Sequence, residues 1–505
     1  VFRAYFRILS DDEKAKLLSD LAGLEDVRAG LTGPEIVKTA LKGLGVTGAK
    51  VAQVLATHKG LVPEEYARPL ESFKDRAQDF DKMRAFSVIS ERMARLSGLT
   101  APADTAAMPS SGEMSAWARE ALPKESEVER RRMVRQVEYL LKDQGRKMRW
   151  MELLGRELGS GSIKVVYKIG LDDGRIWVAK LRAPGAAYRT GREFEILDGL
   201  ITELQAEGDL KTPGAAQLLE EVKSLVNAEM DFRDESGKQK AMTARGAQRP
   251  WYAALIAGLR PRIARPHPVY VGEDLMIEEY MDTTRFTDLP VWSPVGPSQR
   301  SIARQAVQEG MLDLILDGRL EPDPHTGNRH ASHSWFDRLR SRLVVMDVGQ
   351  EVGLPIDVVK PLLKAGVALE AGDVPGAARM ILSIVQVPDT QSAEVVEKAV
   401  IGVLQSQSQS GIVERLVAAL LEAEKNDALV KPQYAALEKA FLIYTGYDHR
   451  LPKDYIYKSI ERAVAVRVLR DRPVSVWTLL KLQVKRLLLG AASVRAELDG
   501  VIDKL

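Results

Sequence analysis

The stretches EPDPHTGN, residues 321–328, and RLVVMDVG, residues 342–349, decide the fold. The first sets Asp323 five residues before Asn328 in a turn rich in proline and glycine, and the second ends an apolar strand at Asp347. The first spacing is that of the D-x-x-x-x-N catalytic loop of protein kinases, and the second repeats D-x-G. We therefore predict a magnesium–triphosphate site, in which Asp323 orients or deprotonates the acceptor. Asn328 and Asp347 supply the hard oxygen ligands that magnesium prefers.

A glycine-rich stretch lies upstream, in LGSGSIKVVYK at residues 158–168. Glycines between two predicted strands let backbone N–H groups approach a phosphate. The predicted phosphate-contacting residues are Gly159, Ser160, Gly161 and Ser162. The stretch lacks the G-K-[ST] of a Walker loop and leads into a strand instead of a helix, which argues against P-loop and Rossmann sites.

One hairpin later, Lys180 lies inside the apolar strand WVAKL. A buried lysine is costly unless it is paired, and this position matches the kinase lysine that holds the α- and β-phosphates. The stretch NAEMDFRDES, predicted as helix, offers Glu229 or Glu235 as the partner. These two are six residues apart, roughly 240° around a helix, so they cannot serve one lysine together. The sequence leaves the choice between them open.

Composition excludes several functions. The chain has 505 residues, a net charge of +2 and no cysteine. The balanced charge argues against nucleic acid as a partner, and the missing thiols exclude disulfides, thiolate metal sites and cysteine nucleophiles. No apolar run is long enough to cross a membrane, and we expect a cytoplasmic protein. The basic amphipathic stretch 476–494 predicts a helix that packs on its own domain or touches a membrane surface.

The pattern of helices and strands predicts five segments. They are a helical N-terminal extension (1–100), a linker rich in Ala, Pro, Ser and Gly (101–126), an N-lobe with a helical insert (127–282), a C-lobe (283–390) and a helical C-terminal region (391–505). Because the chain opens without an initiator methionine, we also consider that it is part of a larger polypeptide or assembly.

The order of these motifs resembles the UbiB family of atypical kinases. That family carries K-x-G-Q, E-x-D, DPHPGN and a D-F-G-like strand end. In LGVTGAKVAQVLATHKGLVPEEY, Lys50 and Gln53 correspond to the lysine and glutamine of K-x-G-Q. In EMDFRDE, Glu229 and Asp231 correspond to E-x-D. The stretch DPHTGN differs from DPHPGN by one residue. The resemblance covers about residues 35–385.

The resemblance implies an α+β, bilobal protein-kinase-like fold with a helical N-terminal extension and a helical C-terminal tail. It implies ATP and Mg²⁺ as cofactors, with adenine bound near the linker by Glu279 and Met281. It also implies a brake, in which the N-terminal extension covers the active site and Lys50 and Gln53 meet Glu229 and Asp231. The family's alanine-rich phosphate loop is GSGS here, which predicts nucleotide handling closer to that of ordinary kinases.

The acceptor stays open at this point. The chain returns to helix soon after Gly349 and lacks an A-P-E, so a small-molecule or lipid acceptor, or ATP hydrolysis coupled to a partner, is favoured over a protein acceptor. Two alternatives are an aminoglycoside-phosphotransferase-like small-molecule kinase, which has no need of Lys50, Gln53 and Glu229, and a nucleotide-binding pseudokinase that acts as a scaffold. Turnover separates the enzymes from the scaffold.

Overall fold

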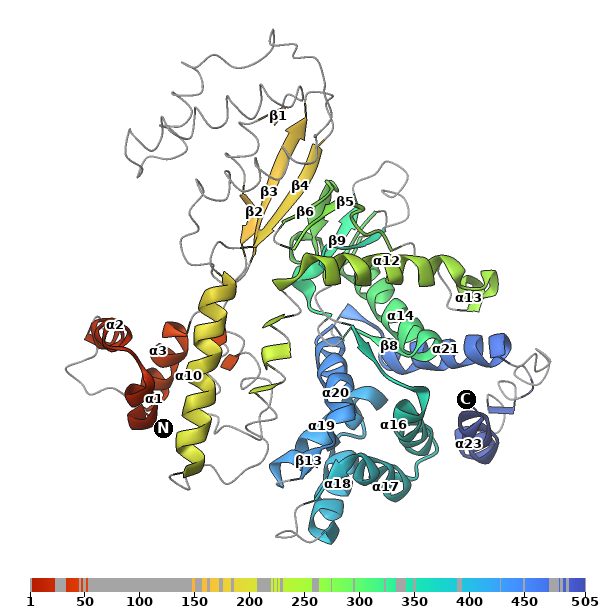
Figure 1. Cartoon of the computed structure of the whole chain (residues 1–505). Coiled ribbons are helices and arrows are strands. Elements are labelled where there is room, and N and C mark those ends of the chain that lie inside the picture. The colour runs from red at the N-terminus through yellow and green to blue at the C-terminus, as the bar shows by residue number, and fades with distance from the viewer. Residues whose placement is uncertain are drawn as a thin grey trace. The chain divides into compact units, whose positions relative to one another are not determined.

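The computed structural model describes most of the chain outside the predicted linker. The described residues are 2–22, 33–44, 47–48, 51–52, 148–149, 157–160, 164–171, 176–182, 186–206, 219–220, 222–224, 226–227, 230–256, 263–273, 275–293, 296–321, 324–332, 342–347, 351–387, 393–426, 428–447, 450–471, 481, 485–486 and 490–504. They belong to two compact units (Figure 1). The first unit is Val1–His58, Val62–Ser236 and Pro266–Tyr280, and the second is Lys59–Leu61, Gly237–Arg265 and Met281–Leu505.

The first unit is built on an antiparallel sheet. Its strands are β1 (Met148–Arg149), β2 (Glu157–Ser160), β3 (Lys164–Leu171), β4 (Ile176–Arg182), β5 (Pro268–Val271) and β6 (Leu275–Glu279). They follow the order β1-β3-β4-β6-β5, and β2 also pairs with β3. Strands β3 and β4 pair in continuous register from Lys164↔Arg182 to Gly170↔Ile176, in agreement with the hairpin predicted before Lys180.

Helices at the N-terminus pack on a long helix of the same unit. Helices α1 (Phe2–Ile8), α2 (Asp11–Ala22) and α3 (Gly33–Gly43) lie beside α10 (Ala186–Ala206) in Figure 1. Their shared core contains Tyr5, Leu9, Leu17, Leu41, Leu44, Ala52, Ile196, Leu197 and Leu219. Burial of these apolar side chains is the driving force that holds the extension on α10.

The second unit is mostly helical. Its helices are α13 (Trp251–Ile256), α14 (Gln299–Asp317), α16 (Ile356–Glu370), α17 (Val374–Ile384), α18 (Ala393–Ser406), α19 (Ile412–Lys425), α20 (Pro432–Thr445), α21 (Tyr455–Asp471) and α23 (Arg495–Asp503), with 3₁₀ turns η3 (Phe286–Asp288), η4 (Thr326–Asn328) and η6 (Ala491–Val494). Its short strands are β7 (Thr283–Arg285), β8 (Arg319–Leu320), β9 (Arg329–Ser332), β10 (Leu343–Val345), β11 (Val352–Gly353), β12 (Val385–Gln386) and β13 (Leu429–Val430).

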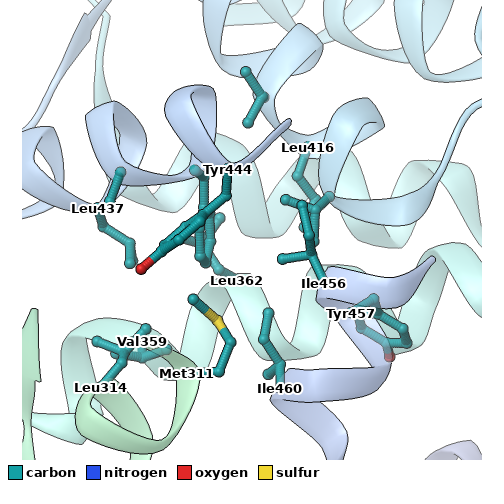
Figure 2. Close-up of a cluster of buried hydrophobic side chains, with 14 of the residues drawn as sticks. Met311, Leu314, Val359, Leu362, Leu416, Leu437, Tyr444, Ile456, Tyr457 and Ile460 are labelled. Atoms are coloured by element: carbon teal, nitrogen blue, oxygen red, sulfur yellow. The ribbon is translucent and has the colours of Figure 1, made fainter. Parts of the chain in front are cut away.

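One hydrophobic core runs through these helices. Figure 2 shows part of it, where side chains of five helices meet: Met311 and Leu314 of α14, Val359 and Leu362 of α16, Leu416 of α19, Leu437 and Tyr444 of α20, and Ile456, Tyr457 and Ile460 of α21. Helix α14 starts at a capping box between Ser298 and Ser301 and ends at Gly318. Gly318 has φ +61°, a left-handed conformation that glycine adopts without steric cost. The chain leaves this turn directly into β8 and the loop that carries Asn328.

The stretch 227–236 differs from the single helix predicted for it. Helix α12 (Phe232–Gln248) begins only after Asp231, which is not helical. Its first turn belongs to the first unit, and its residues from Gly237 belong to the second. Aspartate favours the cap position because its side chain bonds to backbone N–H groups that the helix leaves without partners. Within the described residues, no helix has the length and apolarity needed to span a bilayer.

Candidate functional site

Lys180 is the centre of a buried ionic cluster in the first unit. Strand β4 carries it into the interior, where the residue is 4% exposed. Its Nζ lies 2.8 Å from Oε1 of Glu235 and 2.9 Å from Oε1 of Glu278. Charged groups so far from water require such partners, since the desolvation cost is offset only by close opposite charge.

The start of α12 positions Glu235. Asp231 caps the helix, with Oδ1 accepting a 2.8 Å hydrogen bond from the Arg233 amide. Arg182, at the end of β4, donates to the Met230 carbonyl at 3.0 Å and ties the strand to the residue before the cap. The first turn of α12 thereby directs Glu235 to Lys180, and of the two glutamates left open by the sequence it is Glu235 that the structure brings there.

Glu278 is a partner that sequence reasoning missed. Its position on β6 follows from the sheet register, in which Lys180 pairs with Met276. Side chains two residues apart on a strand share a face, so Glu278 lies on the same face as Met276 and Lys180. The available signal was an acidic residue inside the apolar strand LMIEE, where burial is complete at Glu278.

Other predicted nucleotide contacts lie at strand ends. Gly159 and Ser160 belong to β2 and pair with Val166 and Val165 of β3. Glu279 is exposed at the end of β6, and its amide donates to the His267 carbonyl at 3.0 Å, so this N–H group already has a partner inside the sheet. Met281 is half-buried.

The second unit brings Asn328 and Asp347 close in the backbone. Strands β9 and β10 pair with Val345 opposite Arg329, and the Met346 amide donates to the Asn328 carbonyl at 3.1 Å. Asp347 follows at the end of β10, half-buried. An amide and a carboxylate side chain are oxygen donors of the kind that magnesium takes. The described residues contain no cluster of three or more His, Cys, Asp or Glu that would hold a metal without a substrate.

The loop before Asn328 is held from both sides. Arg329, 3% exposed, makes an ion pair with Glu321. Burial alone would lower the pKa of Arg329, but the Glu321 carboxylate, with Tyr447 and Tyr444, offsets the effect of burial and raises the pKa above its usual value. The Tyr447 hydroxyl donates to the Pro324 carbonyl, and the Tyr447 ring stacks on Phe286 at 5.6 Å between centroids.

A polar clamp fixes the N-terminal extension just before Lys50. The Thr47 amide and hydroxyl both donate to Oε2 of Glu193 on α10, at 2.9 and 2.5 Å. Burial raises the pKa of Glu193, and the Thr47 hydrogen bonds partly offset this rise. Gly48 packs so closely that a Cβ would lie 1.8 Å from the Leu41 carbonyl oxygen. Sequence reasoning did not detect this clamp, because Thr47 and Glu193 are far apart in the chain.

Several predicted residues lie outside the described part of the chain. They are Lys50, Gln53, Gly161, Ser162, Glu229 and Asp323, together with the predicted linker 101–126 and most of the basic stretch 476–494. The geometry above therefore concerns Lys180, Glu235, Glu278, Asn328 and Asp347.

Comparisons with known proteins point to a family of kinase-like domains. Residues 132–381 match the model of the ABC1 atypical kinase-like domain. A comparison with curated proteins finds no match. Among solved structures, the complex of Rv3197 with erythromycin from Mycobacterium tuberculosis is 17% identical, with alignment over 75% of this chain and 94% of that chain and a TM-score of 0.42. The matched stretch, residues 132–381, is thus similar to an ABC1 atypical kinase-like domain, and it contains Lys180, Glu235, Asn328 and Asp347.

Proposed function

We propose that this chain is an ATP- and magnesium-dependent atypical kinase or ATPase of the UbiB type. The buried contact between Lys180 on β4 and Glu235 on α12 carries the proposal. In protein kinases the equivalent strand lysine is held by a helix glutamate and binds nucleotide phosphates. Both residues lie inside the stretch that matches an atypical kinase-like domain.

Each residue then has a chemical role. Lys180 binds the α- and β-phosphates, and Glu235 orients its ammonium group. Asn328 and Asp347 would hold magnesium, which would supply positive charge to the phosphates. Asp323 orients the acceptor hydroxyl or water and takes its proton. The glycine-rich stretch 159–162 would supply backbone N–H groups to the phosphates.

The acceptor is a small molecule or a lipid, or the enzyme couples hydrolysis to a partner. Helix α16 begins at Ile356, so only residues 348–355 separate it from Asp347. A peptide-docking activation segment would have to fit into that stretch. The shortness of this connection favours acceptors that need no extended docking surface.

The N-terminal extension acts as a brake in this proposal. Lys50 and Gln53 meet Glu229 and Asp231 and restrict access to the site. Support comes from the residues beside Lys50, because Thr47 is clamped to Glu193 and Ala52 is fully buried against α10. The chain is therefore tethered to α10 on both sides of Lys50.

The test compares wild type, Asp347→Asn and Lys50→Ala in magnesium-dependent ATP binding and phosphate release. We expect Asp347→Asn to weaken magnesium-dependent binding at least about tenfold, about 1.4 kcal/mol. We expect Lys50→Ala to raise phosphate release several-fold. If wild type binds no nucleotide with magnesium, the proposal is wrong. Tight binding without phosphate release would favour the pseudokinase scaffold, and turnover indifferent to Lys50→Ala would favour the aminoglycoside-phosphotransferase-like alternative.

A further inference from the structure

A second lysine shares the carboxylate that holds Lys180. Lys164, the first residue of β3, has its Nζ 3.1 Å from Oε2 of Glu235, while Lys180 lies 2.8 Å from Oε1 of the same group. In the pattern G-x-G-x-x-G, Gly159 and Gly161 take the first two glycine positions, and Lys164 stands where a third glycine is expected. A long cation therefore replaces the residue whose lack of a side chain gives a phosphate loop its room.

Sheet register puts both lysines on one face. Val166 pairs directly with Lys180 across β3 and β4. Lys164 precedes Val166 by two residues, so its side chain leaves the sheet on the same face as Lys180. The side chain of Lys164 is 15% exposed and that of Lys180 is 6% exposed, so the outer of the two cations is the one beside the glycine-rich stretch.

With Lys164, this cluster holds two ammonium groups and two carboxylates. Glu235 already has a buried cation in Lys180, and Lys180 has a second carboxylate in Glu278. Placing another ammonium group in a largely buried site costs desolvation and side-chain entropy. A phosphate on this sheet face would accept charge-assisted hydrogen bonds from both ammonium groups, in addition to their contacts with the carboxylates.

We propose that Lys164 and Lys180 form a lysine pair for the phosphates of a nucleoside di- or triphosphate, with Glu235 holding both ammonium groups on one face of the sheet. This inference rests on the proposed function, since it needs a nucleotide in the first unit. Lys164 contributes only when phosphates are present, so its effect grows from AMP to ADP to ATP and is absent for adenosine.

The experiment measures dissociation constants of the full chain for ATP, ADP, AMP and adenosine by calorimetry. The variants are Lys164→Gln, Lys164→Arg and Lys164→Gly. The matched control is Lys223→Gln, which removes the same charge from a surface lysine of this unit that pairs with Asp198 and Glu220. We expect Lys164→Gln to weaken ATP binding about tenfold with adenosine unchanged, Lys164→Arg to retain most of the affinity, and Lys223→Gln to bind like wild type.

Three outcomes overturn the inference while the proposed function stands. The first is wild-type ATP affinity in Lys164→Gln. The second is an equal loss for ATP and adenosine, which indicates damage to the fold. The third is tighter ATP binding by Lys164→Gly, because that variant completes the glycine pattern and would show that Lys164 obstructs phosphate. A wild type that binds no nucleotide at all overturns the inference and the proposed function together.

Discussion

Lys180 is held between two carboxylates that depend on it. Replacing it by methionine keeps the length of the side chain but leaves Glu278 without this cation and Glu235 with Lys164. Removing one member of a buried ionic cluster typically costs 3–5 kcal/mol, and since Lys164 stays on Glu235 we expect the lower end, about 3 kcal/mol. Chemical unfolding of Lys180→Met measures this loss.

The double variant Lys180→Met/Glu278→Gln provides the control. Neutralising Glu278 removes the buried charge that the first substitution uncovers, so we expect part of the stability to return. If the double variant is as unstable as the sum of its single variants, the two residues do not act as a pair.

Glu438 makes stability depend on pH. Burial, with a smaller contribution from Glu424, raises the pKa of Glu438 in α20 from its usual 4.5 to about 8. A carboxyl with a raised folded-state pKa stabilises the fold below pH 4.5 and loses that contribution as the pH rises through 8. Each pH unit in this window costs up to about 1.4 kcal/mol. We expect Glu438→Gln to remove this pH dependence of the unfolding free energy.

Unfolding free energies between pH 5 and 8.5 test the effect. Glu394→Gln on α18 is the control, because that glutamate is exposed and pairs with Lys398 at the surface. An identical pH profile for Glu438→Gln and wild type would contradict the prediction.

At the scale of elements, close helix packing depends on a glycine. A Cβ at Gly310 in α14 would lie 2.0 Å from the hydroxyl oxygen of Tyr444, a residue 1% exposed on α20 (Figure 2). Gly402 on α18 has no neighbour within 4 Å of that position. We expect Gly310→Ala to cost about 1–3 kcal/mol from overpacking. We expect Gly402→Ala to add up to about 1 kcal/mol through helix propensity.

Urea unfolding of Gly310→Ala and Gly402→Ala measures the stability of each variant and tests this expectation. The substitution is the same in both helices, so the difference isolates packing from propensity. Equal stabilities would mean that Tyr444 moves aside without cost.

Elements also show how far local sequence reasoning extends. The α+β fold class is confirmed. It could be predicted because both the alternation in the strand around Lys180 and the helical periodicity elsewhere are patterns between residues that are close in the sequence. The partner of Lys180 depends on where α12 begins, which the Asp231 cap decides. Glu278 reaches Lys180 through β4–β6 pairing, and Thr47 reaches Glu193 from a different element. Such contacts join residues that are far apart in the chain, so the spacing of neighbouring residues in the sequence does not predict them.

At the scale of the second unit, residues beyond the matched domain support the loop before Asn328. The match ends at residue 381, yet Tyr447 donates to the Pro324 carbonyl and stacks on Phe286. Tyr447→Phe keeps the ring and removes the hydrogen bond. On the proposed function, we expect turnover to fall about tenfold with ATP affinity nearly unchanged, and stability to fall by about 1 kcal/mol.

Steady-state kinetics of Tyr447→Phe beside Tyr434→Phe check this prediction. Tyr434 is a buried tyrosine of α20, so it matches the substitution within the same hydrophobic core. Equal turnover in the two variants would show that the Tyr447 hydroxyl does not position the loop.

The bond between Tyr447 and Pro324 also sets an order of events during synthesis. The two residues are 123 positions apart in the sequence, and the ribosome adds Tyr447 after Pro324. At roughly 5–20 residues per second, a ribosome takes about 6 to 25 s to travel from one to the other. Each new copy therefore passes through an interval in which the loop has been made and its anchor has not. The hydrogen bond to the Pro324 carbonyl can form only after Tyr447 has been made, so the support of this loop is completed well after the loop itself is synthesised.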